Sequence, residues 1–392
     1  MAVLWLMPFI RIEPAPVDFL IWGLGAALFL TRPSAFWQPF APLVRVAIGL
    51  LALSHVSLLW APELGRAAFF TLATAEMFVI SVIFINFSGY PAVRHRLYLA
   101  FIGGSLVASV IGILAYFDLF PQSEVFMFFD FRAMSVFQGP NVFGGYLVTA
   151  VVLAWFRLPV VRDRLTFWLA SAQLGSGFLL TFAIILSGSR MAGGGLAISL
   201  ALAFLWRVSR DRSWLSAFRQ WIRGWPIAVG MVLAVAMVLH PGVWSMLEDR
   251  LTLYKSYDHE RFEFQEKAIE RSTGGDEQAN ENVLAFTFGL GPGQSEPVLS
   301  YATHNLYLRV WYELGLIGLV GLACLLVGVG RALRQRPSTD RSDTEMLAIV
   351  LIGILVMSLV IDTLHWRHFF VFMGLALAQP EADDHRDGTA IS

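Results

Sequence analysis

The chain has 392 residues, of which 57% are hydrophobic and only 15% are charged. A soluble protein of this size carries about 25% charged residues, so the composition excludes an ordinary soluble enzyme and predicts an integral membrane protein. The net charge of −1 and the placement of arginines in short loops give no indication of nucleic-acid binding. The single cysteine, Cys324, excludes an intrachain disulfide and a cysteine-based zinc site.

The N-terminal residues 1–10 are apolar, but the stretch is short. It lacks a basic start and a small-residue cleavage site, so we interpret it as a short first helix rather than a signal peptide. About 20 apolar residues cross a bilayer, and the remaining apolar runs bring the expected total to about twelve transmembrane helices. The expected ranges are 17–31, 42–60, 66–88, 97–117, 141–157, 165–187, 191–207, 225–240, 305–330, 345–361 and 364–378.

Arginines are distributed unevenly between alternate loops of this layout. The loops on one side contain Arg94, Arg162, Arg219 and Arg334 with their basic neighbours, whereas the opposite short loops contain little beyond Arg132. Since cytoplasmic loops are enriched in arginine and lysine, the basic side is predicted to face the cytoplasm. The outer segments are then the loops 118–140 and 241–303 and the corners at 187–190 and 362–365.

Residues 241–303 are the only segment with the composition of a soluble domain. The spacing over residues 259–272 predicts a helix with Phe262, Gln265 and Ile269 on one face, and Gly-Leu-Gly-Pro-Gly at 289–293 predicts a tight turn. The sequence therefore predicts an all-α, polytopic membrane helix bundle with one large, partly helical outer loop. Its parts are the helices of residues 1–240, the loop 241–303, and residues 304–392 with the last helices and a short tail.

Three residues on the predicted outer face are candidates for chemistry, because charge at a membrane boundary is costly and usually functional. Arg190 lies at the junction of two helices, Arg261 lies on the loop helix, and His304 lies where the loop re-enters the membrane. Each also has a plainer explanation. Arg190 is compatible with snorkelling to the interface, Arg261 with a surface ion pair, and His304 with a structural hydrogen bond.

Considered together, these side chains suit a phosphate-bearing substrate and a hydroxyl nucleophile. A guanidinium presents a planar fork of donors that matches phosphate oxygens and stays charged at physiological pH. Two arginines would stabilise the charge that develops on a diphosphate leaving group. A histidine with a near-neutral pKa can accept the proton of an attacking hydroxyl.

Five short motifs follow one another between residues 137 and 318. They are Phe-Gln-Gly-Pro-Asn at 137–141, Ser-Gly-Ser-Arg at 187–190, Gly-Leu-Gly at 289–291, His-Asn-Leu-Tyr at 304–307 and Glu-Leu-Gly-Leu-Ile-Gly at 313–318. In order, spacing and common sidedness they resemble the O-antigen ligase and polymerase superfamily. The resemblance covers the chain from the first of these motifs to the last, and the twelve-helix layout with one large late loop agrees with it.

The resemblance implies a metal-independent, cofactor-free, inverting glycosyltransferase in the bacterial inner membrane, with its large loop in the periplasm. Such an enzyme moves a glycan from undecaprenyl diphosphate to an acceptor hydroxyl. By position, Arg190 and Arg261 match the diphosphate-binding arginines, and His304 matches the histidine that activates the acceptor. The family usually follows the second arginine with a tryptophan-containing helix, whereas this chain has Arg-Phe-Glu-Phe-Gln at 261–265. The expected supporting residues within the motifs are Asn141, Ser189, Asn305 and Glu313.

More than one acceptor is compatible with this resemblance. A lipopolysaccharide ligase passes the glycan to lipid A-core, and a polymerase passes it to another lipid-linked glycan; both stay open. The short loop 118–140 argues against polymerases with two long outer loops. The protein-modifying relatives often carry an extra C-terminal segment that this sequence does not show.

A polytopic transporter is the alternative from another class, with Asp362, His365, Arg367 and His368 along a translocation path. Transporter sites tend to lie near the bilayer midplane in interrupted helices, whereas here we expect an apolar midplane with the polar residues at one face. His365 and His368 are three residues apart and are also compatible with metal ligation. Their interface position favours snorkelling, and no metal site is expected.

Overall fold

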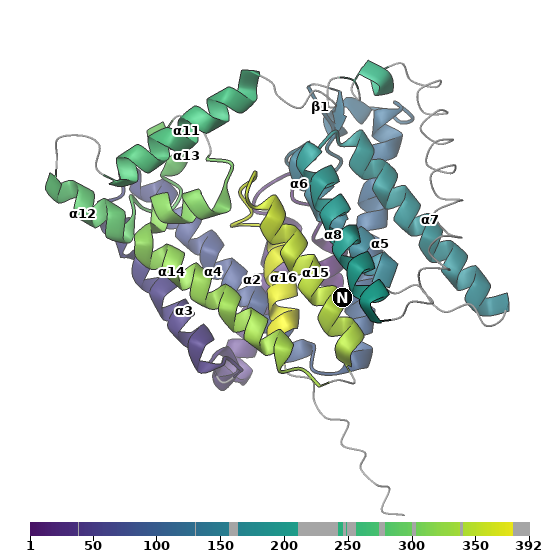
Figure 1. Ribbon diagram of the computed structural model, residues 1–392, viewed down its shortest axis with the longest axis horizontal. Coiled ribbons are helices and arrows are strands. Elements are labelled where there is room, and N and C mark those ends of the chain that lie inside the picture. The colour runs from purple at the N-terminus through teal and green to yellow at the C-terminus, as the bar shows by residue number, and fades with distance from the viewer. Residues whose placement is uncertain are drawn as a thin grey trace, which may run out of the picture.

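The computed structural model describes residues 1–37, 39–129, 131–156, 164–210, 242–245, 248, 256–273, 279–299, 303–337 and 340–378. This part of the chain is almost entirely helical, which confirms the predicted all-α class (Figure 1). Two short strands, β1 (Met127–Phe128) and β2 (Arg132–Ala133), pair antiparallel, with Met127 opposite Ala133.

The long apolar helices coincide with the apolar runs of the sequence. The α-helices before the large loop are α1 (Ala2–Leu6), α2 (Pro16–Thr31), α3 (Pro42–Ser54), α4 (Leu64–Phe87), α5 (Pro91–Tyr116), α6 (Pro140–Phe156), α7 (Arg164–Leu186) and α8 (Arg190–Arg210). Those from the loop onward are α11 (Ser256–Thr273), α12 (Ala279–Phe288), α13 (Ser295–Leu299), α14 (Leu306–Arg334), α15 (Arg341–Met357) and α16 (Arg367–Leu377). Short 3₁₀ helices are η1 (Pro33–Phe36), η2 (His55–Trp60) and η3 (Ser123–Phe126).

Four helical segments of the described chain are long and apolar enough to cross a membrane: Pro42–Trp60, Leu64–Phe87, Pro91–Tyr116 and Leu306–Arg334. Shorter apolar helices of 10–17 residues accompany them, such as Pro140–Phe156. The expected range 225–240 lies outside the described residues. The molecule is thus a bundle of apolar helices with the composition of a membrane protein.

Two expected membrane-spanning helices are corrected. Helix α1 has 5 residues and α16 has 11, and at about 1.5 Å per residue neither crosses a hydrocarbon core of about 30 Å. The ring of α1 residue Trp5 packs against the middle of α5, where a Cβ added at Gly103 would lie 2.5 Å from it. The apolar run 364–378 begins with irregular backbone, and its helix starts only at Arg367.

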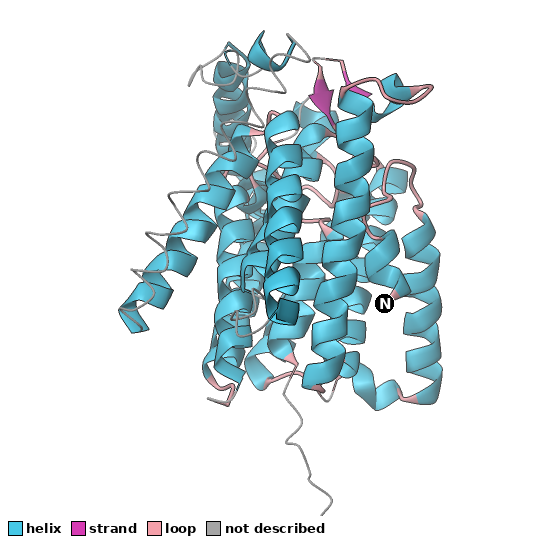
Figure 2. Ribbon diagram, turned by 90° about the vertical axis from the view of Figure 1, so that its right-hand side faces the viewer, coloured by secondary structure: helices cyan, strands magenta, loops and turns pink. Residues whose placement is uncertain are grey.

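The helices form two groups with α15 and α16 between them (Figure 1). One group contains α3, α4 and α14, and the other contains α5, α6, α7 and α8. The long helices run roughly parallel or antiparallel to one another (Figure 2). Their buried faces make one continuous hydrophobic core that includes Leu147, Leu180, Leu347 and Phe372.

At one end of the bundle, which we call the basic end, Arg94 joins α5 to α15 through ion pairs. This side chain is fully buried, and its Nη2 lies 2.7 Å from Asp340 Oδ2 while its Nε lies 3.2 Å from Asp343 Oδ2. The beginning of α5 therefore meets the beginning of α15. Arg331, Arg334, Arg336 and Arg341 lie at this same junction between α14 and α15, whereas the beginning of α14 lies at the opposite end, which we call the cap end.

The cap consists of α11, α12 and α13, which lie against the first part of α14 (Figure 1). Helix α11 confirms the helix expected over residues 259–272, but its predicted apolar face is wrong. Phe262 and Ile269 are 61% and 41% exposed, whereas Ala268 is buried against Leu299 and Tyr312. The buried face is narrow because a short side chain allows α11 to approach its neighbours closely.

Candidate functional site

The corner that precedes Arg190 is built by close packing against α6. Gly188 has φ 56°, a left-handed conformation that glycine adopts without strain. The Ser189 side chain caps α8 by accepting a hydrogen bond from Ala192 N at 3.2 Å. A Cβ added at Gly144 would lie 2.7 Å from Ser187 Oγ. The first residue of α8, Arg190, is therefore held at a fixed position, and its side chain is half-buried.

Arg132 ties two of the sequence motifs together at this corner. Its Nε donates to the Ser187 carbonyl oxygen at 2.7 Å, and its Nη2 donates to Asn141 Oδ1 at 2.7 Å. The side chain is 7% exposed. Asn141, expected to support the site, is thus a partner of Arg132. This role of Arg132 is not visible in the sequence, because its partners lie 9 and 55 residues away.

His304 is fixed by its backbone on both sides. It has φ 48° and is half-buried, and it immediately precedes Asn305, whose Oδ1 caps α14 by accepting from Tyr307 N and Leu308 N at 2.9 and 3.0 Å. On the cap side, Gln265 Nε2 donates to the Thr303 carbonyl oxygen at 3.1 Å. The expected supporting role of Asn305 corresponds here to an N-cap.

The segment 358–366 lies between His304 and Arg190. Leu306 N donates to the Ser358 carbonyl oxygen at 3.0 Å, and Asn305 Nδ2 donates to the Leu359 carbonyl oxygen at 3.0 Å. At its other end, the Trp366 ring would lie 2.4 Å from a Cβ added at Gly145, and Met191 Cε would lie 3.5 Å from the same atom. The residues after His304 are therefore bonded to one end of this segment, and the other end packs on Gly145, which Met191 also approaches.

Arg261 lies on α11, one helical turn before Gln265. Positions i and i+4 share a helix face, and Gln265 is bonded to the residue before His304. The backbone of Arg261 is consequently one helical turn from the residue that bonds to Thr303, next to His304. The side chain of Arg261 lies outside the described part of the chain.

The side chain of Glu313, on α14, binds the cap through hydrogen bonds. Its buried carboxylate accepts from Gly293 N at 2.7 Å, from Ser295 Oγ at 2.6 Å and from Arg309 Nε at 3.1 Å. Ser295 N donates to it as well, at 3.2 Å. With four donors and 1% exposure, this carboxylate holds the glycine-rich turn in place and is not available to a substrate.

The backbones of the Gly-Leu-Gly motif at 289–291 and of the Glu-Leu-Gly-Leu-Ile-Gly motif at 313–318 pack directly against each other. A Cβ added at Gly289 would lie 2.2 Å from the Glu313 carbonyl oxygen, and one added at Gly315 would lie 2.4 Å from Phe288 N. Both glycines have positive φ, 81° and 67°, which favours glycine. The predicted turn at 289–293 is confirmed, and Gly315 divides α14 into two helical segments.

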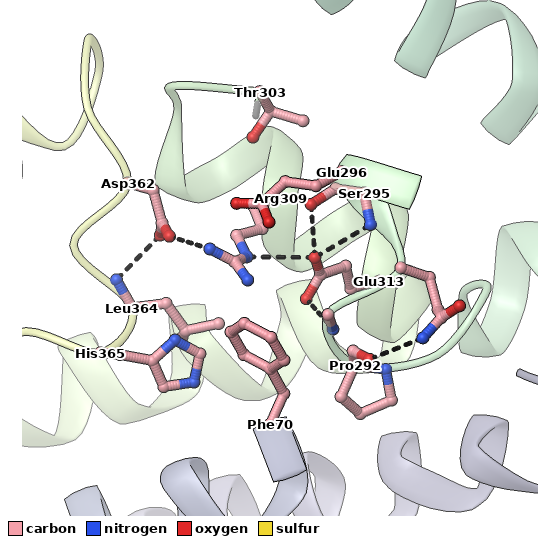
Figure 3. Close-up of polar contacts among 12 residues, drawn as sticks. Phe70, Pro292, Ser295, Glu296, Thr303, Arg309, Glu313, Asp362, Leu364 and His365 are labelled. Atoms are coloured by element: carbon pink, nitrogen blue, oxygen red, sulfur yellow. Dashed lines mark hydrogen bonds and ion pairs between the residues drawn. The ribbon is translucent and has the colours of Figure 1, made fainter. Parts of the chain in front are cut away.

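Arg309 is a buried cation that the sequence analysis did not consider (Figure 3). Its Nε bonds to Glu313, its Nη1 pairs with Asp362, and its side chain is 6% exposed. The third nitrogen, Nη2, is buried without a hydrogen-bond partner among the described residues. A buried donor of this kind is costly to leave unsatisfied, so Arg309 has one donor to offer to a bound anion.

The Phe70 ring lies at the centre of this cluster. The guanidinium carbons of Arg309 and Arg66 lie 5.1 and 5.2 Å from its centroid, and the His365 ring lies 5.3 Å away (Figure 3). Arg66 pairs with Glu296 and donates from Nε to the Gly293 carbonyl oxygen at 2.6 Å. The aromatic face stabilises both cations and keeps them close to the glycine-rich turn.

The pKa values of the loop residues Asp362 and His365 are both lowered, and Arg309 contributes to each shift. Burial, and after it the positive charge of Arg309, lower the pKa of His365 to about 3, so the ring is neutral at pH 7. Burial alone would raise the pKa of Asp362, but Arg309 outweighs this and holds that pKa below its usual value. The pair Arg309–Asp362 is therefore charged, beside a neutral imidazole.

A second group of buried charges corrects the expectation of an apolar midplane. Arg367, at the start of α16, donates from Nε and Nη2 to the two oxygens of Asp18 at 2.8 and 2.9 Å. Glu76 Oε1 lies 3.5 Å from Arg367 Nε. Glu76 is the thirteenth of 24 residues of α4, so these charges lie well inside the bundle and not at one face.

His365 and His368 face different neighbours. The His365 ring contacts Phe70 and lies 3.3 Å from Thr74 Oγ1, both on α4, whereas the His368 ring contacts Phe101 and Tyr146. The two rings are not arranged to hold one ion. Within the described ranges, no group of three or more His, Cys, Asp or Glu side chains has the arrangement of a metal site.

Comparison with known proteins does not assign this geometry. No model of a known protein family matches the chain, and no curated protein matches it.

Proposed function

We propose that this protein is a membrane glycosyltransferase of the O-antigen ligase type. It transfers a glycan from undecaprenyl diphosphate to an acceptor hydroxyl on the periplasmic face of a bacterial inner membrane. The observation that carries the proposal is the segment 358–366. One of its ends is hydrogen-bonded to Asn305, the residue after His304, and the other packs on Gly145, which Met191, the residue after Arg190, also approaches.

In the proposed reaction His304 accepts the proton of the acceptor hydroxyl as its oxygen bonds to the anomeric carbon. The bond between that carbon and the diphosphate oxygen breaks on the opposite face, and the electron pair leaves with the diphosphate. Arg190 and Arg261 bind the leaving diphosphate, and Arg309 contributes its Nη2, which has no hydrogen-bond partner among the described residues. Ser189, Asn305 and Glu313 act by holding the backbone that carries these groups.

A lipid-linked donor is supported by an apolar cavity of about 430 Å³ between α3, α4, α14 and α16. Val44, Ile48, Phe78 and Leu325 are among its lining residues. Thr74 lines it too and lies 3.3 Å from His365 Nε2, so one end of the cavity reaches the Arg309 cluster. A long prenyl chain suits such walls.

The test uses membrane vesicles that contain the full-length protein and a lipid-linked glycan. We expect His304→Ala and His304→Gln both to lower the rate of undecaprenyl diphosphate release by about 10²–10⁴-fold, because neither side chain accepts a proton near neutral pH. His259→Gln is the matched control, since His259 is exposed on α11 and pairs with Glu263 at 3.4 Å. Substantial activity of His304→Gln would leave His304 a positioning role only.

The chemical identity of the product shows which acceptor the enzyme uses. Transfer to lipid A-core gives a glycan that is no longer attached to diphosphate, as expected of a ligase. A polymerase gives lipid-linked glycans of increasing length. Product analysis by mass spectrometry in the same vesicles separates the two.

A transporter is the second candidate, because α14 is interrupted at Gly315, α16 begins inside the bundle, and Asp18, Glu76 and Arg367 are buried there. Transporter sites share these features. A transporter would move the lipid-linked glycan between leaflets without breaking the glycosidic bond. Intact donor in the product fraction, with movement abolished by Glu76→Gln, would favour transport over transfer.

A further inference from the structure

A cavity of about 680 Å³ opens at the basic end of the bundle, at the other end of α14 from His304. It lies between α14 and α15, with Trp206 of α8 at its edge. Its apolar wall includes Leu326, Val329, Leu333, Leu351, Ile352 and Leu355. The glycan-transfer reaction has no use for this space.

The polar part of the lining is rich in arginine. Arg334, Arg336 and Arg341 line the cavity, and Glu345 is the carboxylate among its described lining residues. Arg341 is 63% exposed, and its Nε lies 3.4 Å from Glu345 Oε1. Arg336 is buried and pairs with Asp340, so Arg334 and Arg341 beside the single carboxylate of Glu345 leave an excess of positive charge in the described lining.

Arg336 has an unused donor in this lining. Its side chain is 1% exposed. Nη2 donates to the Leu375 carbonyl oxygen and, at 3.1 Å, to that of Ala378, while Nη1 lies 3.5 Å from Asp340 Oδ2. Nε is buried without a hydrogen-bond partner among the described residues. Such a donor indicates an absent acceptor.

We propose that this cavity binds an anionic phospholipid. Its phosphate lies against Arg334, Arg336 and Arg341, and an acyl chain lies along the apolar wall. Guanidinium groups match phosphate oxygens in geometry and charge, and basic pockets between membrane helices suit anionic headgroups. A free phosphate would satisfy the arginines but leave the apolar wall without a partner. Trp206 also lines the cavity, and tryptophan is favoured at the membrane interface, where a lipid headgroup lies.

The first test concerns the headgroup. Full-length protein in detergent is titrated with dioleoyl-phosphatidylglycerol or dioleoyl-phosphatidylcholine, and bound lipid is counted by native mass spectrometry. We expect tighter binding of the phosphatidylglycerol. Arg334→Gln and Arg341→Gln should each weaken it about fivefold. Arg331→Gln is the matched control, because Arg331 is exposed in the same last turn of α14 but does not line the cavity.

The second test concerns the apolar wall. Gly330 lines the cavity, and a Cβ added there meets nothing within 4 Å. Gly330→Trp should therefore fill the space and abolish phosphatidylglycerol binding, whereas Gly330→Ala should bind normally. Thermal unfolding of each variant shows whether it is folded, and any variant that is not folded is replaced by Gly330→Leu.

Three results would overturn the proposal. The first is that phosphatidylcholine binds as tightly as phosphatidylglycerol. The second is that Arg331→Gln weakens phosphatidylglycerol binding as much as Arg334→Gln and Arg341→Gln do. The third is that glycerol phosphate or inorganic phosphate displaces the bound lipid at the same concentration as phosphatidylglycerol does. The last would indicate a site for a soluble anion. Glycan transfer is not measured in any arm, so the outcome does not depend on the enzymatic proposal.

Discussion

The carboxylate of Glu313 accepts a hydrogen bond from the backbone N–H of Gly293 at 2.7 Å, across 20 residues of sequence. The same carboxylate accepts from Arg309 Nε. One buried side chain therefore joins the glycine-rich turn of the cap to a cation of the Asp362 cluster. Loss of this carboxylate would leave Arg309 with Asp362 as its remaining described ion-pair partner.

We expect Glu313→Ala to destabilise the protein by about 3–5 kcal/mol, because three buried donors of Gly293 and Ser295 lose their acceptor and Arg309 loses one of its two carboxylate partners. Thermal unfolding in detergent measures the change. Glu296→Ala is the control, since Glu296 also pairs with an arginine but its side chain is 42% exposed, and its loss should cost at most about 1 kcal/mol. Equal effects of the two substitutions would contradict the fastening role.

Replacement of Arg190 by lysine separates substrate binding from snorkelling. Lysine snorkels equally well, but it cannot make two parallel hydrogen bonds to a diphosphate. We expect Arg190→Lys to accumulate normally in the membrane and to transfer glycan about tenfold more slowly or worse. Arg96→Lys, an exposed arginine of α5, should be silent. Wild-type transfer by Arg190→Lys would remove the diphosphate role.

Acid should destabilise the protein through His365. Its pKa is about 3 in the folded state and about 6.5 in the unfolded chain, so below pH 6.5 the unfolded state binds the extra proton. Stability is then fully present above pH 6.5 and falls by about 2 kcal/mol at pH 5. The melting temperature of His365→Gln should lose most of this dependence between pH 7.5 and 5, whereas His259→Gln should retain it. An unchanged pH profile in His365→Gln would count against a buried neutral imidazole.

Reporter fusions test the orientation that the arginine distribution predicts. A fusion after Gly275 in the cap loop should behave as periplasmic, and one after Asp211 should behave as cytoplasmic. Both positions lie outside the described ranges. A cytoplasmic signal at Gly275 would reverse the topology and place His304 on the wrong side for a periplasmic reaction.

Apolar runs were sufficient to predict where the long helices lie, because each run has to bury or shield its backbone in a helix. The run 364–378 misled us for a specific reason. Its first residues lie in irregular backbone and have partners far away in the sequence, such as Thr74 for His365. Hydropathy does not distinguish such a segment from the start of a helix.

The candidate site was only partly predictable. Short motifs indicated Arg190 and His304, but Arg309 precedes Glu313 by four residues and looks like a local helix pair. Its second partner, Asp362, lies 53 residues later. Likewise Asp18 and Glu76 each interrupt an apolar run as a single charge, and only tertiary packing brings both to Arg367.

The break at Gly315 divides α14 into two segments that can tilt independently of each other. A continuous helix transmits rotation along its length, so any tilt or twist imposed on residues 316–334 by the thickness of the surrounding membrane would turn residues 306–314 with it. The non-helical backbone at Gly315 interrupts that transmission. The backbone position of His304 is consequently set by the bonds of its neighbours, Thr303 to the cap and Asn305 to segment 358–366, and we expect it to stay the same in bilayers of different thickness.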